Sequence, residues 1–374
     1  MIRPYQVCTR CIMDISDPLI VFDEDGYCNH CTEALNRINE QLLPLSGRAQ
    51  ALDVLIDKIK KEGKGKPYNC IIGLSGGVDS STVAYWVSKL GLNPLAIHFD
   101  NGWNSELSVD NINMLVDKLK IDLYTYVVDW SEFRDLQLAY IKSSVANCEA
   151  PTDHAISALL WNAAKQHKVK YVLTGSNLAT ESIMPYSWGH YNQDLKNIRA
   201  IHKQFGTMPL KTFPTRRLDR YFYDVFVKRI RFIPFLNYLD YNKDQSKQML
   251  ISEIGWRDYG GKHYESIWTR FFQGYYLPVK FGFDKRRPHL SSMICAGLLS
   301  REEALAEMEK ASYDENLLQN DMEFVLKKFD FTMEQFEKLM KTPPRPATDF
   351  PSHYYLFHIM AKYKNIFRKI ATSG

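Results

Sequence analysis

From residue 69 to residue 174, short apolar runs alternate with longer stretches of mixed polarity. The short runs predict buried strands at residues 69–74, 94–99, 123–128 and 170–174. The stretches between them carry apolar side chains at helical spacing, at residues 80–90, 105–120 and 153–167. Strands that alternate with helices form a parallel sheet with helices on both faces. The region therefore predicts a doubly wound α/β sheet, whose ligands bind at the carboxyl ends of its strands.

The pattern changes on both sides of this region and divides the chain into three predicted domains. Residues 1–45 hold four cysteines, and residues 46–200 carry the sheet after a basic, glycine-containing linker at 58–66. Residues 201–374 lose the alternation of strands and are expected to be mainly helical. A chain of 374 residues has room for two to three domains.

Composition and charge exclude several classes of protein. The chain is 45% hydrophobic and 24% charged, as globular proteins are, and its net charge of +4 gives no reason to expect nucleic acid. No stretch approaches the roughly 20 apolar residues of a membrane helix, and the first residues lack the apolar core of a signal peptide. We therefore expect a cytoplasmic protein without membrane contact. Its 7 cysteines would stay reduced, which favours metal binding or catalysis over disulfides.

The strongest motif directly follows the first predicted strand and opens the first predicted helix. It consists of Ser75, Gly76, Gly77, Val78, Asp79, Ser80 and Ser81. Glycines let the backbone approach an anion closely, and the free N–H groups at a helix start hold phosphate. The three serine hydroxyls add donors, whereas Asp79 could also be a plain helix-cap residue. The motif is no Walker loop, because the Gly-Lys-Ser/Thr that defines one is absent.

This Ser-Gly-Gly-x-Asp-Ser pattern resembles the PP-loop ATP-pyrophosphatases, a resemblance that implies ATP as substrate and AMP and pyrophosphate as products. It further implies that Phe99 and Asp100, at the end of the second strand, lie near the adenine. An ordinary Asp-Asn-Gly turn explains these two residues equally well. Gly175 and Asn177, followed by Glu181, resemble a segment of NAD synthetase and its relatives in which the acid helps to hold Mg²⁺. A bare helix cap at Asn177 is the alternative.

Two Cys-x-x-Cys pairs near the amino terminus have the spacing of a four-cysteine zinc ribbon. They are Cys8 with Cys11 and Cys28 with Cys31. His30 lies inside the second pair, but four cysteines are the simpler ligand set for Zn²⁺. A closed shell of four thiolates leaves no open position for catalysis, so we expect a structural zinc. Acidic residues around the ribbon would repel the phosphates of RNA.

Polar groups set among aromatic residues distinguish the carboxyl-terminal third, at 256–266 and 283–292. Together with the ribbon and the segment that begins at His98, they resemble the N-acetyl sugar amidotransferases of bacterial surface-polysaccharide synthesis, including lipopolysaccharide and its O-antigen. The resemblance covers nearly the whole chain. It implies an AMP-forming C–N ligase that turns an acetamido group of a sugar or nucleotide sugar into an acetamidino group. ATP would adenylate the amide oxygen, and ammonia would then displace AMP.

Several residues are candidates for this chemistry besides Asp79. Lys285, Arg286 and Lys262 are candidates for binding pyrophosphate or an acidic sugar, since cations neutralise the departing charge. His263 or His289 could move a proton. For each of these, an ordinary surface charge or a satisfied histidine is an equally good interpretation.

The resemblance also implies separate partner subunits, a glutaminase and a cyclase-like protein that channels ammonia, since the chain shows no glutaminase nucleophile. A PP-loop tRNA thiolase is the alternative function. It would need a cysteine that carries a persulfide, and Cys148 stands alone where thiolases have a Cys-x-x-Cys pair. A zinc-ribbon interaction protein without enzymatic activity is disfavoured by the complete phosphate loop.

Overall fold

The computed structural model describes residues 4–189, 191–261 and 264–362. Its centre is a five-stranded sheet in the order β3-β2-β1-β4-β5, in which neighbouring strands run parallel. The strands are β1 (Cys70–Gly73), β2 (Pro94–Asp100), β3 (Asp122–Val127), β4 (Tyr171–Thr174) and β5 (Arg231–Pro234). The chain moves to one side of β1 for β2 and β3, and to the other side for β4 and β5. This doubly wound order confirms the predicted α/β fold and places a switch point between β1 and β4.

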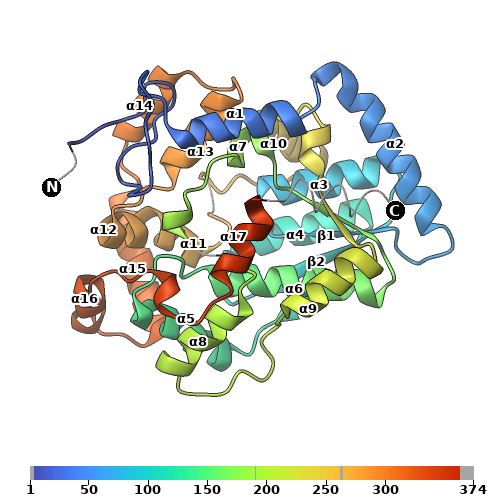
Figure 1. The fold of residues 1–374 in the computed structure, drawn as a ribbon. Helices are drawn as coiled ribbons and strands as arrows, with labels where there is room; N and C mark the ends of the chain where they lie inside the picture. Colours follow the sequence, from blue (N-terminus) through green and yellow to red (C-terminus); the bar gives the residue numbers. More distant parts are fainter. Residues whose placement is uncertain (1–3, 190, 262–263, 363–374) are drawn as a thin grey trace.

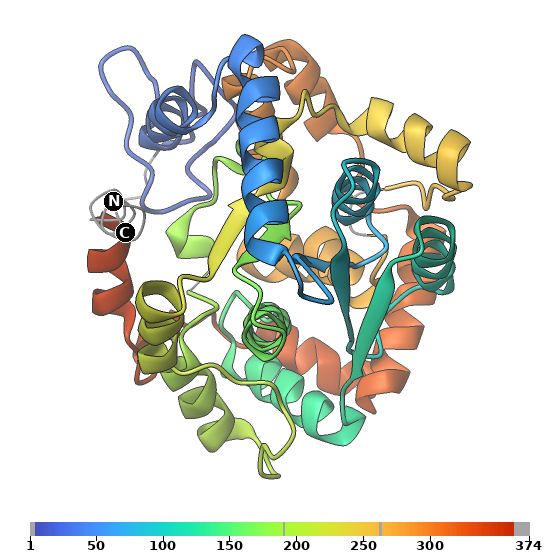
Figure 2. The same cartoon turned by 90° about the vertical axis from the view of Figure 1, so that its right-hand side faces the viewer.

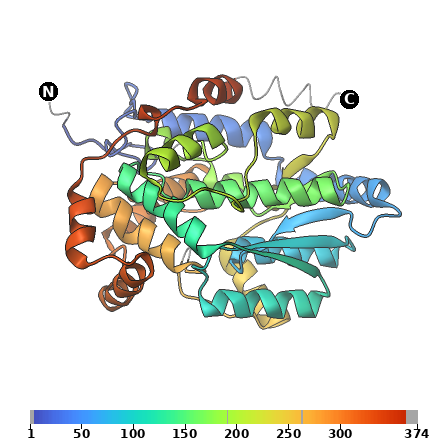
Figure 3. The same cartoon turned by 90° about the horizontal axis from the view of Figure 1, so that it is seen from below.

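The two faces of the sheet bury separate hydrophobic layers. Ile71 and Val172 face one layer, whereas Cys70 and Ile72 face the other. The first layer is shared with α5 (Trp130–Ser143), α6 (Ala150–Gln166) and α8 (Leu195–Phe205). The second is shared with α2 (Leu45–Gly63), α3 (Val78–Lys89), α4 (Glu106–Leu119) and α10 (Lys243–Ile254). Figure 3 shows the strands between α6 and α4, and Figure 2 shows the layers from the side.

The strand β5 lies in a region whose pattern does not predict a strand. It pairs with β4 at the edge of the sheet, and its side chains are only partly buried. It ends at Pro234, and proline is tolerated at sheet edges because one side of an edge strand forms no ladder. A partly buried edge strand whose apolar run is only Phe232 and Ile233 lacks the longer run by which buried strands are recognised.

The carboxyl-terminal region is mainly helical, as expected. Its helices are α9 (Leu218–Phe222), α11 (Ile267–Phe271), α12 (Leu277–Phe281), α13 (Arg286–Cys295), α14 (Arg301–Glu309), α15 (Glu315–Phe329), α16 (Met333–Lys341) and α17 (Tyr354–Lys362). Short helical turns lie at Tyr186–Trp188, Tyr223–Val227, Phe235–Tyr238, Phe272–Tyr276 and Ala347–Asp349. Trp268, Phe329 and Phe336 join the same hydrophobic layer as α5 and α6, so this region shares a core with the sheet. Among the described residues, no helix is both long and apolar enough to cross a membrane.

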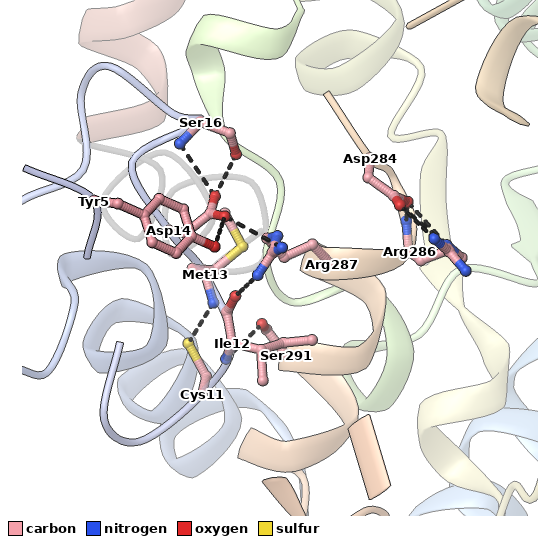
Figure 4. A network of polar contacts seen from close by, with 10 residues as sticks. All are labelled: Tyr5, Cys11, Ile12, Met13, Asp14, Ser16, Asp284, Arg286, Arg287 and Ser291. Atoms are coloured by element: carbon pink, nitrogen blue, oxygen red, sulfur yellow. Dashed lines mark hydrogen bonds and ion pairs between the residues drawn. The ribbon is translucent and has the colours of Figure 1, made fainter. Parts of the chain in front are cut away.

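The amino-terminal ribbon, followed by α1 (Asn29–Gln41), rests on α13 (Figures 1 and 4). Ile12 donates its backbone N–H to Ser291 Oγ at 3.2 Å, and Arg287 Nη1 donates to the Ile12 carbonyl oxygen at 2.6 Å. Arg287 also pairs with Asp14 at 3.2 Å. The first and last thirds of the chain are thereby joined through main-chain and charged contacts.

Candidate active site

The loop between β1 and α3 has a backbone conformation that only glycine can adopt at one position. Gly76 has a φ of +80°, and a Cβ built there would lie 2.5 Å from the carbonyl oxygen of Ser108. The indole Nε1 of Trp256 donates a hydrogen bond to the Gly76 carbonyl oxygen at 3.1 Å. The loop is therefore fixed from both sides, by α4 and by the chain that follows α10.

The amino terminus of α3 opens at this loop without a capping side chain on Gly77. Ser75 and Ser80 point their hydroxyls at each other, 3.1 Å apart, and both residues line a cavity. Ser81 is fully buried instead, on the side of the helix that faces the sheet core. The Val78 N–H donates to the hydroxyl of Tyr259 at 3.1 Å, so a tyrosine hydroxyl already sits at the start of this helix.

Asp79 lies in the first turn of α3 and accepts a hydrogen bond from the hydroxyl of Tyr241. Burial and the charge of Asp79 raise the pKa of Tyr241, which keeps the phenol protonated as a donor. The end of β4 packs directly on this turn, because a Cβ on Gly175 would come within 3.1 Å of Asp79. The two strand ends that carry the phosphate-loop motif and the Thr174-Gly175 segment are thus adjacent, at the switch point of the sheet.

A cavity of about 930 Å³ opens at the carboxyl ends of β1 and β2. It is large enough for a ligand of nucleotide size, by the usual range for such sites. Leu74, Ser75 and Ser80 form its phosphate-loop wall, and Phe99 forms the wall beside β2. The two residues predicted to lie near the adenine therefore differ in position. Phe99 lines the cavity, whereas Asp100 is not among the described lining residues. Its Oδ1 accepts the Gly102 N–H at 2.9 Å, as the turn interpretation requires.

The ribbon forms a second wall of this cavity. Asp17, His30 and Arg37 all line it. His30 Nε2 lies 2.5 Å from Asp17 Oδ2, and Arg37 Nη1 donates to the carbonyl oxygen of Ser182 at 3.0 Å. The ribbon is therefore part of the enclosure, in addition to any structural role of its metal.

A third wall is aromatic. Tyr186, Tyr191, Phe272 and Tyr354 line the cavity, and the first two have ring centroids 5.8 Å apart. Tyr354 belongs to α17 and lies 5.9 Å from the Tyr191 ring. Aromatic faces beside polar groups suit the apolar faces of sugar rings and bases.

The fourth wall carries three titratable side chains, Glu149, Asp153 and Lys285. Thr269 Oγ1 donates to Glu149 Oε1 at 2.9 Å. Burial and then the negative charge of Asp153 raise the pKa of Glu149 to about 8. Burial lowers the pKa of Lys285, an effect that Asp153 and Glu149 oppose. This wall therefore holds one carboxyl group, that of Glu149, whose pKa lies near neutral pH.

The four cysteines of the ribbon meet at one point. Their sulfur atoms all lie within 4.8 Å of one another, with Cys8 and Cys31 at 3.7 Å and Cys11 and Cys28 at 3.6 Å. Zn–S bonds of about 2.3 Å in a tetrahedron place sulfurs about 3.8 Å apart, so the set suits zinc. Backbone N–H groups of the two turns donate to the Cys8 and Cys28 sulfurs, which favours thiolates.

Two family models match separate parts of the chain. Residues 49–213 match NAD synthase, and residues 265–364 match the C-terminal domain of WbpG-like lipopolysaccharide biosynthesis proteins. The chain thus joins an NAD synthase-like PP-loop region to a region that matches the WbpG-like C-terminal domain of lipopolysaccharide biosynthesis proteins. The first match indicates an ATP-utilising enzyme of the ligase type, a class in which Mg²⁺ accompanies the phosphates of ATP.

Individual relatives are distant. An uncharacterized protein of Methanocaldococcus jannaschii, MJ1599, is 23% identical over 267 residues, which are 69% of this chain and 78% of that protein. The NMN synthetase from Francisella tularensis is 22% identical with a TM-score of 0.29, over 37% of this chain and 56% of that one. The NH₃-dependent NAD synthetase from Campylobacter jejuni, in complex with nitrate, is 17% identical with a TM-score of 0.30, over 43% and 73%. The chain thus spans little more than half of the NMN synthetase.

Two residues of the segment predicted to hold Mg²⁺, Glu181 and Asn177, have different roles in the structure. Glu181 lines the cavity and could hold Mg²⁺ there. Asn177 instead caps α7 (Leu178–Glu181), where its Oδ1 accepts the Thr180 N–H at 2.9 Å. The glycine-only turn at Gly76 and the uncapped start of α3 are the features that a bound polyphosphate needs.

Of the lysine, arginine and histidine candidates, only some lie at the cavity in the described parts of the chain. Lys285 lines the cavity. Arg286 instead pairs with Asp284 at 2.7 Å (Figure 4) and donates to the Lys310 carbonyl oxygen at 2.8 Å. Arg286 is not among the described residues that line the cavity, because these contacts hold it against the start of α13 and the end of α14. His289 Nδ1 lies 3.0 Å from the Thr180 carbonyl oxygen. Lys262 and His263 lie outside the described residues.

Sequence reasoning did not single out Glu149, Asp153, Tyr241 or Tyr259. In the sequence, the segment around Cys148 indicates a possible function only through its cysteine. Glu149 lies four residues before Asp153, where the predicted helix begins, and this spacing puts both acids on one face only because α6 starts earlier than predicted. The two tyrosines had no local signal, since they reach the phosphate loop from a distant part of the chain.

Proposed function

We propose that this chain converts an acetamido group of a sugar or nucleotide sugar into an acetamidino group, at the expense of ATP, during synthesis of a bacterial surface polysaccharide. One observation carries the proposal. A single cavity joins the phosphate loop to walls from the ribbon and from the lipopolysaccharide-type domain. An ATP-utilising loop and an acceptor site of another family would thus work on the same reactants.

The reaction would proceed in two displacements. The acetamido oxygen attacks the α-phosphorus of ATP, and the P–O bond to pyrophosphate breaks. Ammonia then adds to the carbon of the resulting O-adenylyl imidate, and AMP leaves. An amide oxygen is a poor leaving group, and adenylation corrects this.

The residues of the loop have clear tasks in this scheme. The backbone N–H groups at the start of α3 and the hydroxyls of Ser75 and Ser80 would hold the phosphates, with the Tyr259 hydroxyl giving up its bond to Val78. Tyr241 holds the Asp79 carboxylate in place by its hydrogen bond. Glu181 would hold Mg²⁺, which neutralises charge on the departing pyrophosphate. Lys285 adds a cation on the opposite wall.

The acceptor would lie against the aromatic wall. Tyr186, Tyr191 and Tyr354 offer ring faces, and the ribbon offers Asp17 and Arg37 as hydrogen-bonding groups. In this proposal the sugar would occupy the part of the cavity away from the phosphate loop.

Ammonia would come from separate subunits, a glutaminase and a cyclase-like channel protein. In support, no cysteine is found among the described residues that line the cavity, so a thiol nucleophile for glutamine is missing there. The purified chain alone should use ammonium and should not use glutamine.

The alternative, sulfur transfer to tRNA, has little support in the geometry. Cys148 is 1% exposed, and its Sγ lies 3.9 Å from the hydroxyl of Tyr276. Burial raises the pKa of Cys148 to about 12, so the thiol stays protonated and unreactive at neutral pH.

The test is pyrophosphate release from ATP and ammonium. Diacetamido sugars and their nucleotide conjugates would be compared with bulk tRNA plus a sulfur donor. We expect release only with a sugar, and a product about one mass unit lighter as NH replaces O. Release only with tRNA and a sulfur donor would overturn the proposal.

A further inference from the structure

The fourth wall of the cavity brings three structural elements together around one carboxyl group. Glu149 precedes the first turn of α6, and Asp153 follows four residues later on the same face. Thr269 reaches Glu149 from α11 at 2.9 Å, and Lys285 approaches from the residue before α13. Asn192 Nδ2 lies 3.3 Å from Asp153 Oδ2. This wall faces the same space as Ser75 and Ser80 of the phosphate loop.

The carboxyl group of Glu149 has a neutral hydrogen-bond donor but no salt-bridge partner among the described residues. Glu149 accepts the hydrogen bond from Thr269, and within the described ranges Lys285 forms no salt bridge either. Lys285 therefore acts on Glu149 only at longer range. Two carboxyl groups on one helix face repel each other when both are ionised. A small cation that donates hydrogen bonds would relieve this repulsion.

Other carboxyl groups of the cavity are differently placed. Asp17 is bound to His30 and Ser187 in the ribbon. Glu33 is exposed on α1. Glu149 lines the same cavity as Ser75 and Ser80, and it combines a hydrogen-bonding threonine with an acidic neighbour, Asp153, and the charge of Lys285.

We infer that Glu149, supported by Asp153 and Thr269, binds ammonium and removes a proton from it to form the attacking ammonia. This inference rests on the proposed amidotransferase function and deepens it. One N–H bond of ammonium breaks, and its proton goes to the Glu149 carboxylate. The freed lone pair forms the C–N bond to the imidate carbon, and the C–O bond to the adenylyl group breaks as AMP leaves with that electron pair. Glu149 then returns its proton to water.

The electrostatics of the wall agree with this assignment. Burial, Asp153 and Glu265 raise the pKa of Glu149 to about 8, while Thr269 and Lys285 oppose the rise. A base is most effective when its pKa lies near the working pH. Bound ammonium favours the ionised carboxylate, as any nearby cation does. Turnover with ammonium should therefore rise as the pH passes through about 8.

The test compares two half-reactions in Glu149→Gln, which keeps the shape of the side chain. Sugar-dependent exchange of pyrophosphate into ATP, measured without ammonium, should stay within about twofold of the unchanged chain, because it does not involve the nucleophile. The KM for ammonium should rise roughly 10- to 100-fold, the loss expected for one hydrogen bond to a charged group. Glu106→Gln, an exposed acid in the first turn of α4, is the matched control and should change neither quantity.

Hydroxylamine separates proton removal from a structural role, because it is largely neutral near neutral pH and needs no base. Glu149→Gln should turn over hydroxylamine at close to the unchanged rate while it loses ammonium. An equal loss with both nucleophiles, or a raised KM for the sugar with the KM for ammonium unchanged, would overturn the inference. Absence of sugar-dependent exchange in the unchanged chain would instead overturn the proposed function, together with the inference that rests on it.

Discussion

The hydroxyl of Tyr241 donates a hydrogen bond to Asp79, from a position 162 residues further along the chain. Trp256 and Tyr259 reach the same loop, at Gly76 and Val78. The phosphate loop is thus braced by the segment that follows β5. A carboxylate beside polyphosphate needs such support, because like charges repel.

Removal of the Tyr241 hydroxyl should weaken the use of ATP. We expect Tyr241→Phe to lower kcat/KM for ATP about 10-fold or more, since a hydrogen bond to a charged group contributes ~1.5–3 kcal/mol. Tyr238→Phe, in the neighbouring helical turn, is the control and should keep activity. Pyrophosphate release at varied ATP measures both. Equal losses in the two variants would contradict the assigned role.

Gly76→Ala tests the close approach of the loop to α4. Its Cβ would clash with the Ser108 carbonyl oxygen and would also stand at a positive φ. Gly255→Ala is a matched control, because it has a φ of +77° and nothing within 4 Å of the added Cβ. Both should lose ~1–2 kcal/mol of unfolding free energy to the φ angle. Only Gly76→Ala should also lose pyrophosphate release, and a comparable loss in Gly255→Ala would argue against the clash.

Lys285 and Arg286 are adjacent in sequence but should respond differently. Lys285→Met removes a cation from the cavity wall, so we expect a loss of roughly 10-fold or more in kcat/KM with a nearly unchanged Tm. Arg286→Met breaks contacts with Asp284 and with the end of α14, so we expect a lower Tm and normal activity of the folded fraction. Thermal unfolding and steady-state kinetics on both variants check this. A reversed pattern would show that Arg286 is the functional cation.

Loss of the ribbon metal should affect the acceptor more than ATP. We expect about one zinc ion per purified chain, bound by the four cysteines. Cys28→Ser should lose it and should raise the KM for the sugar more than that for ATP, because the ribbon lines the cavity with Asp17 and Arg37. Cys295→Ser, half-buried beside the ribbon, should keep the metal. Metal content by mass spectrometry would refute this if Cys295→Ser lost as much zinc.

His154 should make folding sensitive to acid. Its ring is fully buried, with Nδ1 2.8 Å from the Asn192 carbonyl oxygen, and Nε2 accepts the Arg216 N–H at 3.1 Å. Burial lowers the pKa of His154 from 6.5 to about 4, so the folded state holds the neutral ring. This contribution is present above pH 6.5 and is lost as the pH falls toward about 4, by up to about 3 kcal/mol. Urea unfolding should show a smaller loss over this range for His154→Gln.

The sequence predicts the parts of the fold whose signal is local. Buried strands such as β1 and β4 carry continuous apolar runs between turn residues. The edge strand β5 does not, because Arg231 and Pro234 reduce its apolar run to Phe232 and Ile233, one for each hydrophobic layer. The helix α5 was also unpredicted, although its Phe133, Leu136 and Tyr140 are buried against the sheet.

The same distinction holds for the site. The loop at 75–81 and the four ribbon cysteines are contiguous motifs, so their chemistry is visible in the sequence. The wall around Glu149 joins residues from α6, α11 and the start of α13, and only tertiary packing brings them together. Lys285 and Arg286 are adjacent basic residues that the sequence does not distinguish. Their neighbours in space decide that Lys285 faces the cavity and that Arg286 pairs with Asp284.

The docking of the ribbon on α13 sets an order of events during synthesis on the ribosome. Ile12 finds its partner Ser291 only after another 279 residues have been added. At ~5–20 residues per second, this delay lasts roughly 15 to 55 s. During that time the newly made ribbon lacks its contacts with α13, and a metal ion bound by the four cysteines would reinforce the few backbone hydrogen bonds within it. Zinc supply in the cell would then govern how much nascent chain matures, before any substrate is encountered.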